Sequence, residues 1–194
     1  HKAAEQGNAG AQYMLCACYS HGIGVARDKE EALKWGRMAD DQDGKEPVNW
    51  YREAAERGHT LMQYCLGHYF YFFYDPVEKK YNYYNEAVKW FRKAAAQNFA
   101  RAQYGLGVCY YFGKGLIQDR AEAVKWFRQA AEREYLDAQF MIGYCLYFGE
   151  GLPQEFSEAV TWFRRAAEKG FVAAQYRLGD CYYYGHGVTQ DCLI

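Results

Sequence analysis

The chain has 194 residues, of which 23 are Lys or Arg and 24 are Asp or Glu, so its net charge is −1. This balance leaves no basic field to attract a phosphate backbone, and we expect no nucleic-acid partner. No stretch is long and apolar enough to cross a bilayer, so we expect no membrane insertion. The first residues, HKAAEQGNAG, hold neither an initiator Met nor a signal-peptide core, which indicates a fragment of a longer protein.

The seven cysteines are an odd number in a chain that is long enough to bury a core without disulfides. We therefore expect free thiols, which favours a reducing cytoplasm. A periplasmic or secreted location fits if an upstream signal has been removed. The compartment and the oligomeric state stay open at this point.

Five segments along the chain share one pattern. They read AQYMLCACYSHGIGV, MQYCLGHYFYFFYD, AQYGLGVCYYFGKGL, AQFMIGYCLYFGEGL and AQYRLGDCYYYGHGV, with their glutamines at Gln12, Gln63, Gln103, Gln139 and Gln175. The last two intervals are 36 residues long and the interval before them is 40. A second marker, Trp-Phe-Arg-x-Ala-Ala, lies at Trp90, Trp126 and Trp162, always 13 residues before the next Gln. Two markers in fixed phase indicate an internal repeat.

The beginning of the chain departs from this period. The segment KAAEQG reads as the end of a second helix, and the interval from Gln12 to Gln63 is 51 residues. We expect a helix from Lys29 to about Asp41, a turn at Asp43-Gly44, and a helix that starts at Pro47, because Pro suits a first turn. One repeat has then lost its first helix.

The next departure is the aromatic stretch YFYFFYDPVEKKYNYYN, residues 69–85. Phe73 and Asp75 stand where the other copies have glycines, and four extra residues follow. Without those glycines the helix is expected to run to about Tyr74 before Asp75-Pro76 ends it. A loop carrying Tyr81, Tyr83 and Tyr84 should follow. Phe73 and Tyr74, which have no counterpart in the other repeats, are candidate partner-binding residues; the alternative is that they pack against residues 35–50.

The clearest repeat predicts a first helix from about Ala100 to Phe112, closed by a turn with Gly113 and Gly115. Its apolar residues recur at helical spacing and are Ala102, Leu106, Cys109 and Tyr110. The glycine pairs recur once per repeat, which identifies them as turn glycines rather than a nucleotide-binding loop.

The second helix is predicted to start after Asp119. Its side chain can accept a hydrogen bond from the first turn while Glu122 reaches back, as in a capping box, and DKEE (28–31) and EFSE (155–158) repeat the signal. The face expected to be buried holds Ala123, Trp126, Phe127, Ala130 and Ala131. Such helix pairs cannot bury their apolar faces alone, so they must stack. The fold class is therefore all-α, a right-handed α/α solenoid of repeats of about 36 residues.

The pattern A-Q-[YF]-x-L-G-x-x-Y-Y-x-G-x-G followed by W-F-x-x-A-A resembles the Sel-1-like repeat family, which is related to the tetratricopeptide repeats. The resemblance covers the chain from Ala3 to Asp191 as one solenoid. Its units are about 9–58 with an irregular insertion, 60–98, 100–134, 136–170 and an incomplete 172–194.

The resemblance implies a non-enzymatic adaptor that binds a protein or peptide partner. Cysteine-rich secreted relatives, some described as β-lactamases, leave open the alternative of an enzyme or a binder of cell-wall fragments. Those relatives link the two helices of a unit by a disulfide, whereas this chain has no Cys in any second helix.

Three aromatic or variable columns appear when the repeats are overlaid. The first column is Tyr71, Tyr111, Tyr147 and Tyr183, the second is Phe72, Phe112, Phe148 and Tyr184, and the third is His68, Val108, Tyr144 and Asp180. By analogy with related solenoids, first helices line the concave side, where rings suit an extended peptide. The alternative for each ring is packing between repeats within the core.

No pattern predicts a catalytic site, a metal site or a cofactor. Cys18, Cys109, Cys145 and Cys181 share one repeat position and are expected to be small core residues, too far apart for disulfides. Cys65 with His68, or Cys16 with Cys18, supplies only two of the four ligands that a metal needs. No nucleophile and base converge in a recognisable motif.

Overall fold

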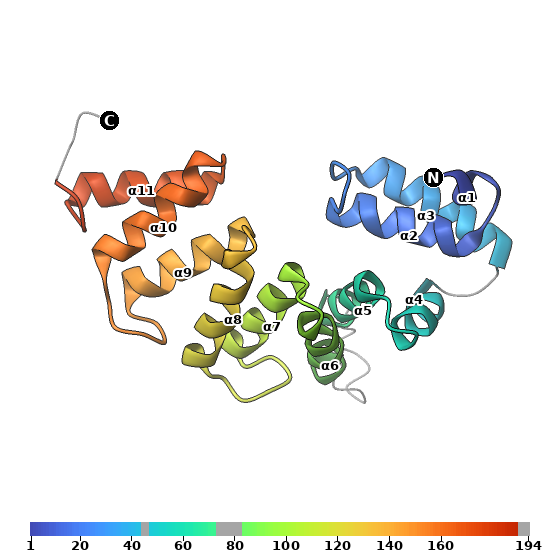
Figure 1. The fold of residues 1–194 in the computed structure, drawn as a ribbon, viewed down its shortest axis with the longest axis horizontal. Coiled ribbons are helices and arrows are strands. Elements are labelled where there is room, and N and C mark those ends of the chain that lie inside the picture. The colour runs from blue at the N-terminus through green and yellow to red at the C-terminus, as the bar shows by residue number, and fades with distance from the viewer. Residues whose placement is uncertain (44–46, 73–82, 190–194) are drawn as a thin grey trace. The chain divides into compact units, whose positions relative to one another are not determined.

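The computed structural model describes residues 1–43, 47–72 and 83–189, and in these ranges it contains eleven α-helices and no strand (Figure 1). The chain divides into two compact units, His1–Phe73 and Tyr74–Ile194. The predicted all-α class is confirmed. Of the helices in the described ranges, none is both long enough and apolar enough to cross a membrane.

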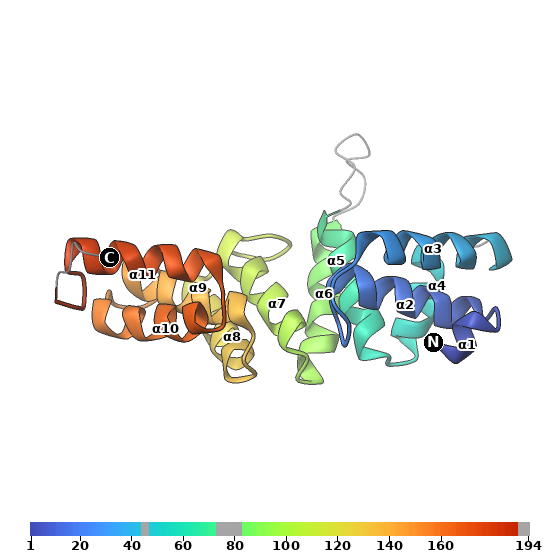
Figure 2. The ribbon, with the colours of Figure 1, turned by 90° about the horizontal axis from the view of Figure 1, so that it is seen from above.

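The first unit contains two helix pairs. Its helices are α1 (Lys2–Glu5), α2 (Ala9–His21), α3 (Lys29–Asp43), α4 (Pro47–Glu56) and α5 (Thr60–Phe72). Helix α2 packs along α3, as both views show, and α4 packs against α5 (Figures 1 and 2). Helices α3 and α4 both correspond to the second helix of a repeat, and no first helix lies between them. This is what the interval of 51 residues from Gln12 to Gln63 predicts. Helix α3 ends two residues later than expected.

The second unit is a regular succession of helices in which each packs on the next. They are α6 (Tyr83–Ala96), α7 (Ala100–Phe112), α8 (Arg120–Glu132), α9 (Leu136–Phe148), α10 (Phe156–Glu168) and α11 (Val172–Tyr184). The loop predicted for Tyr83 and Tyr84 is wrong, because both residues belong to the first turn of α6. Phe73, Tyr74 and Tyr81 lie outside the described residues.

Glycine turns close the first helices α2, α7, α9 and α11, and in the second unit they bring two backbones together. Gly113, at φ +66°, ends α7 in the left-handed conformation that glycine adopts most easily. Gly115, two residues later, lies against the backbone of Tyr84, and a Cβ at this position would collide with the Tyr84 carbonyl. The first glycine therefore turns the chain, and the second lets the turn pack on the preceding second helix.

The second helices begin with side-chain caps. Asp119 Oδ1 accepts a hydrogen bond from the backbone N–H of Glu122 at 2.9 Å. The reciprocal half of the predicted capping box does not form, because the Asp119 N–H donates to the Tyr110 carbonyl and the Glu122 carboxylate pairs with Lys125 instead.

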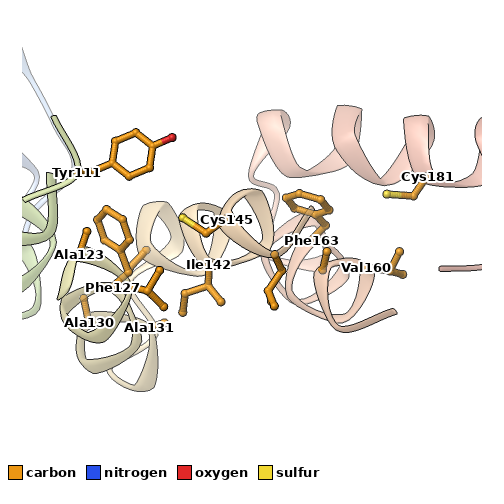
Figure 3. Packing of buried hydrophobic residues seen from close by; sticks show 14 residues of the cluster. Tyr111, Ala123, Phe127, Ala130, Ala131, Ile142, Cys145, Val160, Phe163 and Cys181 are labelled. Atoms are coloured by element: carbon orange, nitrogen blue, oxygen red, sulfur yellow. The ribbon is translucent and has the colours of Figure 1, made fainter. Parts of the chain in front are cut away.

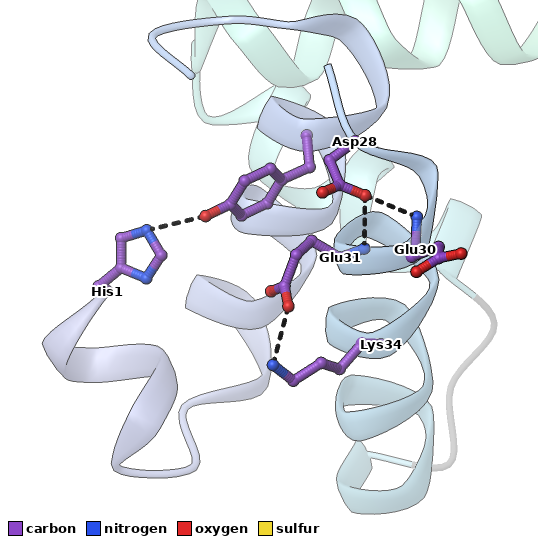
Figure 4. Close-up of polar contacts among 6 residues, drawn as sticks. His1, Asp28, Glu30, Glu31 and Lys34 are labelled. Atoms are coloured by element: carbon purple, nitrogen blue, oxygen red, sulfur yellow. Dashed lines mark hydrogen bonds and ion pairs between the residues drawn. The ribbon is translucent and has the colours of Figure 1, made fainter. Parts of the chain in front are cut away.

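The same arrangement recurs in the first unit. The Asp28 carboxylate accepts from the N–H groups of Glu30 and Glu31, and Glu31 pairs with Lys34 (Figure 4). The Asp28 N–H donates to the carbonyl of Tyr19 on α2. In both repeats, the carbonyl of the preceding first helix takes the donor that a capping box would use.

The core of the second unit lies between successive helices (Figure 3). Phe127 of α8 is fully buried and contacts the helix backbone at Gly107, where a Cβ would collide with its ring; Phe163 and Gly143 repeat this pair. Ala102, Leu106 and Cys109 are buried as expected. Trp126, expected in the core, is only partly buried, whereas the adjacent Phe127 is fully buried.

The repeat glutamines of three motifs tie a repeat to the helix before it. The side-chain Nε2 of Gln12, Gln63 and Gln139 donates to the carbonyl of the residue eight positions earlier, at 3.0, 3.0 and 3.4 Å. Each of these carbonyls also accepts one backbone N–H from the residue three positions after it, so the glutamine supplies a second donor at the C-terminal end of the preceding helix. Gln103 differs, because its Nε2 donates to Oε1 of Gln129 instead.

Candidate partner-binding face

The first aromatic column faces the following repeat rather than solvent. Tyr111 is 7% exposed, and its hydroxyl donates to the carboxylate of Glu150, between the turn glycines of the next repeat. Tyr147 repeats this contact, with its hydroxyl 2.6 Å from Nδ1 of His186. Burial, followed by the Glu150 contact, raises the pKa of Tyr111. Tyr183 on α11 is 59% exposed.

The middle residue of each glycine turn also meets a side chain on the preceding second helix. Lys114 lies 5.0 Å from the ring centroid of Tyr84, and Glu150 lies 3.6 Å from Nε of Arg120. His186 stacks on Phe156 at 4.6 Å. The three junctions therefore use a cation on a ring, an ion pair and two stacked rings at one equivalent position. We call these three contacts the junction pairs.

The second aromatic column faces outward. Phe112, Phe148 and Tyr184 are 57%, 43% and 60% exposed, although each lies directly after a residue of the first column. A step of one residue rotates a helix side chain by about 100°, which takes the second column off the interface between repeats. In the first unit, Phe72 is 64% exposed at the same position, and Tyr71 is partly buried.

The third column lies one helical turn before the second and shares its face. Tyr144 contacts Phe148 with ring centroids 4.6 Å apart. The guanidinium of Arg177 on α11 lies 5.5 Å from the Phe148 ring and pairs with Asp180 at 3.3 Å. These contacts join the two columns on α9 and α11. Together with Val108 and Phe112, which occupy the equivalent positions of α7, we call these residues the aromatic face: Val108, Phe112, Tyr144, Phe148, Asp180 and Tyr184.

The equivalent position in the first unit carries an imidazole. The ring of His68 lies 4.7 Å from that of His21 and 4.4 Å from that of Phe72. Burial, with the nearby His21 and Arg27, lowers the pKa of His68 to about 4. His68 is therefore neutral near pH 7, and its ring contributes an aromatic surface rather than a charge.

The cysteines lie away from this face. The six described cysteines form no disulfide, and Cys109, Cys145 and Cys181 are fully buried, as their repeat position predicts. Cys18, expected to be equally buried, is only partly buried. Burial raises the pKa of Cys109 and of Cys145 to about 12 and that of Cys181 to about 11.

These pKa values keep the thiols protonated and weakly nucleophilic. Within the described ranges, no three side chains of the types that ligate metals gather in one place. The aromatic face offers exposed apolar area with one ion pair beside it.

Two residues of this surface were missed from the sequence. Arg177 covers the Phe148 ring, and Tyr176 beside it is 69% exposed. The overlay of repeats contained a signal for Arg177, because its equivalents are Cys65, Gly105 and Met141, and a cation at that position is new. Of the predicted partner-binding residues, Phe73 and Tyr74 lie outside the described residues.

Stacked helix pairs with glycine turns, a buried repeat glutamine and an exposed ring column define an α/α solenoid of the helical-repeat class. The chain belongs to the Sel1 repeat family. Sel1 repeats match residues 9–44, 41–59, 61–99, 100–135, 136–171 and 172–193. The short second match corresponds to α4, the helix that lacks a first-helix partner of its own. Members of this family are generally protein-interaction scaffolds.

Solved structures of other Sel1 proteins are similar to this chain. A protective antigen of uropathogenic Escherichia coli with an SLR fold is 30% identical, with a TM-score of 0.68; the match covers 98% of this chain and 44% of that one. A Sel1 repeat protein from Oxalobacter formigenes is 33% identical, with a TM-score of 0.68 and coverage of 96% and 69%.

Cysteine-rich protein B of Helicobacter pylori shares the fold at 21% identity, with a TM-score of 0.51 and coverage of 68% and 91%. No curated protein matches the chain. The chain thus spans less than half of the E. coli antigen and about two thirds of the Oxalobacter protein.

Proposed function

We propose that this chain is a non-enzymatic adaptor that holds a peptide or protein partner on its aromatic face. The observation that carries the proposal is the exposure of Phe112, Phe148 and Tyr184 at one repeat position, while Tyr111 and Tyr147 of the neighbouring column contact the next glycine turn. Exposed rings in a row favour association, because covering each one removes apolar area from water. Membership of the Sel1 repeat family supports a role as a protein-interaction scaffold, and we assign partner binding to the aromatic face.

The chemistry of the face indicates the kind of partner. Apolar or aromatic side chains fit the rings of α7, α9 and α11, and a polar group fits beside the Arg177–Asp180 pair. The differences between Val108, Tyr144 and Asp180 give each repeat its own contact, which is how a repeated surface reads one partner rather than any apolar segment. We expect an extended or helical segment with apolar residues on one side.

The alternative of an enzyme or a cell-wall-fragment binder lacks a comparable observation. Catalysis by a thiol needs a thiolate, and burial raises the pKa of the three repeat cysteines to about 11 or 12. Among the six residues that make up the aromatic face, no general base lies beside a nucleophile. We therefore assign no reaction to it.

Photo-crosslinking tests the proposal at the face itself. Benzoylphenylalanine replaces Phe148, and the protein is irradiated in an extract of its native source. The crosslinked segment is then identified by mass spectrometry. A matched protein carries the same group at Ile117, which is 88% exposed in the loop between α7 and α8. We expect one partner to be captured through position 148 and not through position 117.

Substitution of the rings provides the complementary test. Phe112→Ala, Phe148→Ala and Tyr184→Ala together should abolish capture while the melting temperature stays within a few degrees, since exposed residues contribute little to stability. Retention of the same partner by the triple variant would contradict the proposal.

A further inference from the structure

The first unit contains a pocket where the second unit has side chains. It has a volume of about 380 Å³ and lies between α2 and α3, with Cys16 and Ser20 on one side and Gly36 on the other. The corresponding residues of the repeat 100–135, offset by 91 positions, are Gly107, Tyr111 and Phe127. Two aromatic rings of that repeat are thus replaced by a hydroxymethyl group and a hydrogen atom.

The missing rings account for the size and character of the pocket. In the second unit the Phe127 and Tyr111 rings lie 6.4 Å apart, and the equivalent Phe163 and Tyr147 rings lie 6.3 Å apart, so both sites are filled by the chain itself. In the first unit the helices keep the same hairpin and the ring volume stays empty. Ala32 and Leu33 supply the other apolar side chains of the pocket, and Leu33 is 60% exposed.

Three cations surround the same pocket. Arg27, Lys29 and Arg37 line it, and all three are exposed. In the part of the chain that the structure describes, none of them forms an ion pair. Of the acidic residues next to them in the sequence, Asp28 caps α3, Glu31 pairs with Lys34, and Glu30 is exposed. The rim of the pocket therefore carries three cations that form no ion pair among the described residues.

We propose that this pocket binds an aromatic carboxylate: its ring occupies the space that Phe127 and Tyr111 fill in the second unit, and its carboxylate faces Arg27, Lys29 and Arg37. The volume lies within the range of small-ligand sites, and a charged group at one end of an apolar pocket fixes the orientation of the ligand. A free aromatic acid and a peptide that ends in Phe present this same chemistry. The site is separate from the aromatic face and does not rest on the proposed function.

Calorimetric titration of the purified chain tests the proposal with 3-phenylpropanoate and with acetyl-Ala-Ala-Phe. The two probes separate the sources: binding of both indicates a free acid as an adequate ligand, and binding of the peptide alone indicates a chain terminus. Each probe is compared with its amide, which should bind about tenfold more weakly because one charged contact is lost. If neither acid binds, or if the amides bind equally well, the proposal is wrong.

A pocket-filling variant keeps the test independent of folding. Gly36→Phe alone would press its ring against Cys16, because the matching ring in the second unit requires Gly107. We therefore combine Cys16→Gly with Gly36→Phe, which copies the pair found at positions 107 and 127. The double variant gains a ring in the pocket but loses the contact between Cys16 and Tyr51, so its melting temperature should stay within a few degrees of the wild type, and it should lose binding of both acids. Wild-type affinity in this folded variant would overturn the proposal.

The cations and the thiol give two further measurements. Arg37→Gln should weaken binding of either acid about tenfold, whereas Arg128→Gln, at the equivalent and equally exposed position of the filled repeat, should leave it unchanged. Bound 3-phenylpropanoate should slow alkylation of Cys16 and leave Cys18 unaffected, because only Cys16 lines the pocket. The aromatic-face triple variant should bind the acid normally, which separates failure of this site from failure of the proposed function.

Discussion

The hairpins α2–α3 and α7–α8 have first helices of equal length and the same type of turn, but different interiors. In both, the first helix has 13 residues, a glycine ends it, and an aspartate caps the next helix. Between the helices, α7–α8 holds the rings of Tyr111 and Phe127, whereas α2–α3 holds Ser20, Gly36 and a pocket. The turn chemistry therefore sets the backbone of a repeat, and the filling between its helices can change separately.

The largest expected effect on stability comes from removing the buried ring between α7 and α8. Phe127→Ala removes a fully buried ring and should lower the free energy of unfolding by about 3–5 kcal/mol, measured by urea denaturation. Gly36→Ala, at the equivalent place, should be neutral or slightly stabilising, because its Cβ meets only the Cys16 sulfur at ordinary contact distance. Equal effects at the two positions would show that the hairpins do not differ as described.

The second expected effect is a pH dependence of stability in the first unit, caused by His68. Because the pKa of His68 is about 4 in the folded chain, against 6.5 for an ordinary histidine, its contribution to stability is complete above pH 6.5 and is lost as the pH falls from 6.5 towards 4. The positive groups that oppose its protonation are His21 and Arg27. The loss should amount to about 1–3 kcal/mol.

His68→Val supplies the comparison, since Val108 occupies this position in the repeat 100–135. Urea midpoints measured across the same pH range should fall less steeply in the variant than in the wild type. If the urea midpoints of the variant and the wild type fall equally steeply with pH, His68 is not the cause of the pH dependence.

A third, smaller difference in stability is expected when the hydroxyl groups of Tyr111 and Ser20, at equivalent positions of the two hairpins, are removed. Tyr111→Phe removes the hydrogen bond to Glu150 and should cost about 1–2 kcal/mol of unfolding free energy. Ser20→Ala at the equivalent position should cost less than about 0.5 kcal/mol, because Ser20 borders the pocket. Thermal unfolding of the two variants under one buffer condition decides between these values.

The smallest effect should be the same in both hairpins. Asp28→Ala and Asp119→Ala each remove a helix cap and should each cost about 1 kcal/mol. Chemical denaturation of the two variants measures this. A clear inequality would mean that the turns, and not only the interiors, differ between the repeats.

Much of the fold could be predicted from the sequence because the signals are local and repeated. The glycine pairs and the Asp119 cap fix the limits of α7 and α8, and the Pro47 signal fixes the start of α4. The start of α6 could not be placed, since Tyr83 and Tyr84 lie beside a private insertion that has no second copy to align. The Glu122 half of the capping box failed because the competing acceptor, Tyr110, belongs to another helix.

The candidate site was predictable as a set of columns but not as a surface. Tyr111 and Phe112 are adjacent and alike in sequence, and only the position of the next repeat makes one an interior residue and the other an exposed one. The pocket had a signal, because Gly36 stands in WGR where other copies read WFR. Its significance depends on Ser20 and Cys16 of another helix, which the linear pattern does not bring together.

The junction pairs have a consequence for the order of the repeats. In each pair the two residues come from successive repeats: Tyr84 contacts Lys114, Arg120 contacts Glu150, and Phe156 contacts His186. If the repeats 100–135 and 136–171 were exchanged, Phe156 would meet Lys114 and Arg120 would meet His186, so the ion pair and the stacked rings would both be lost. Although the repeats share one backbone plan, they are not interchangeable modules, and their succession is encoded at the junctions.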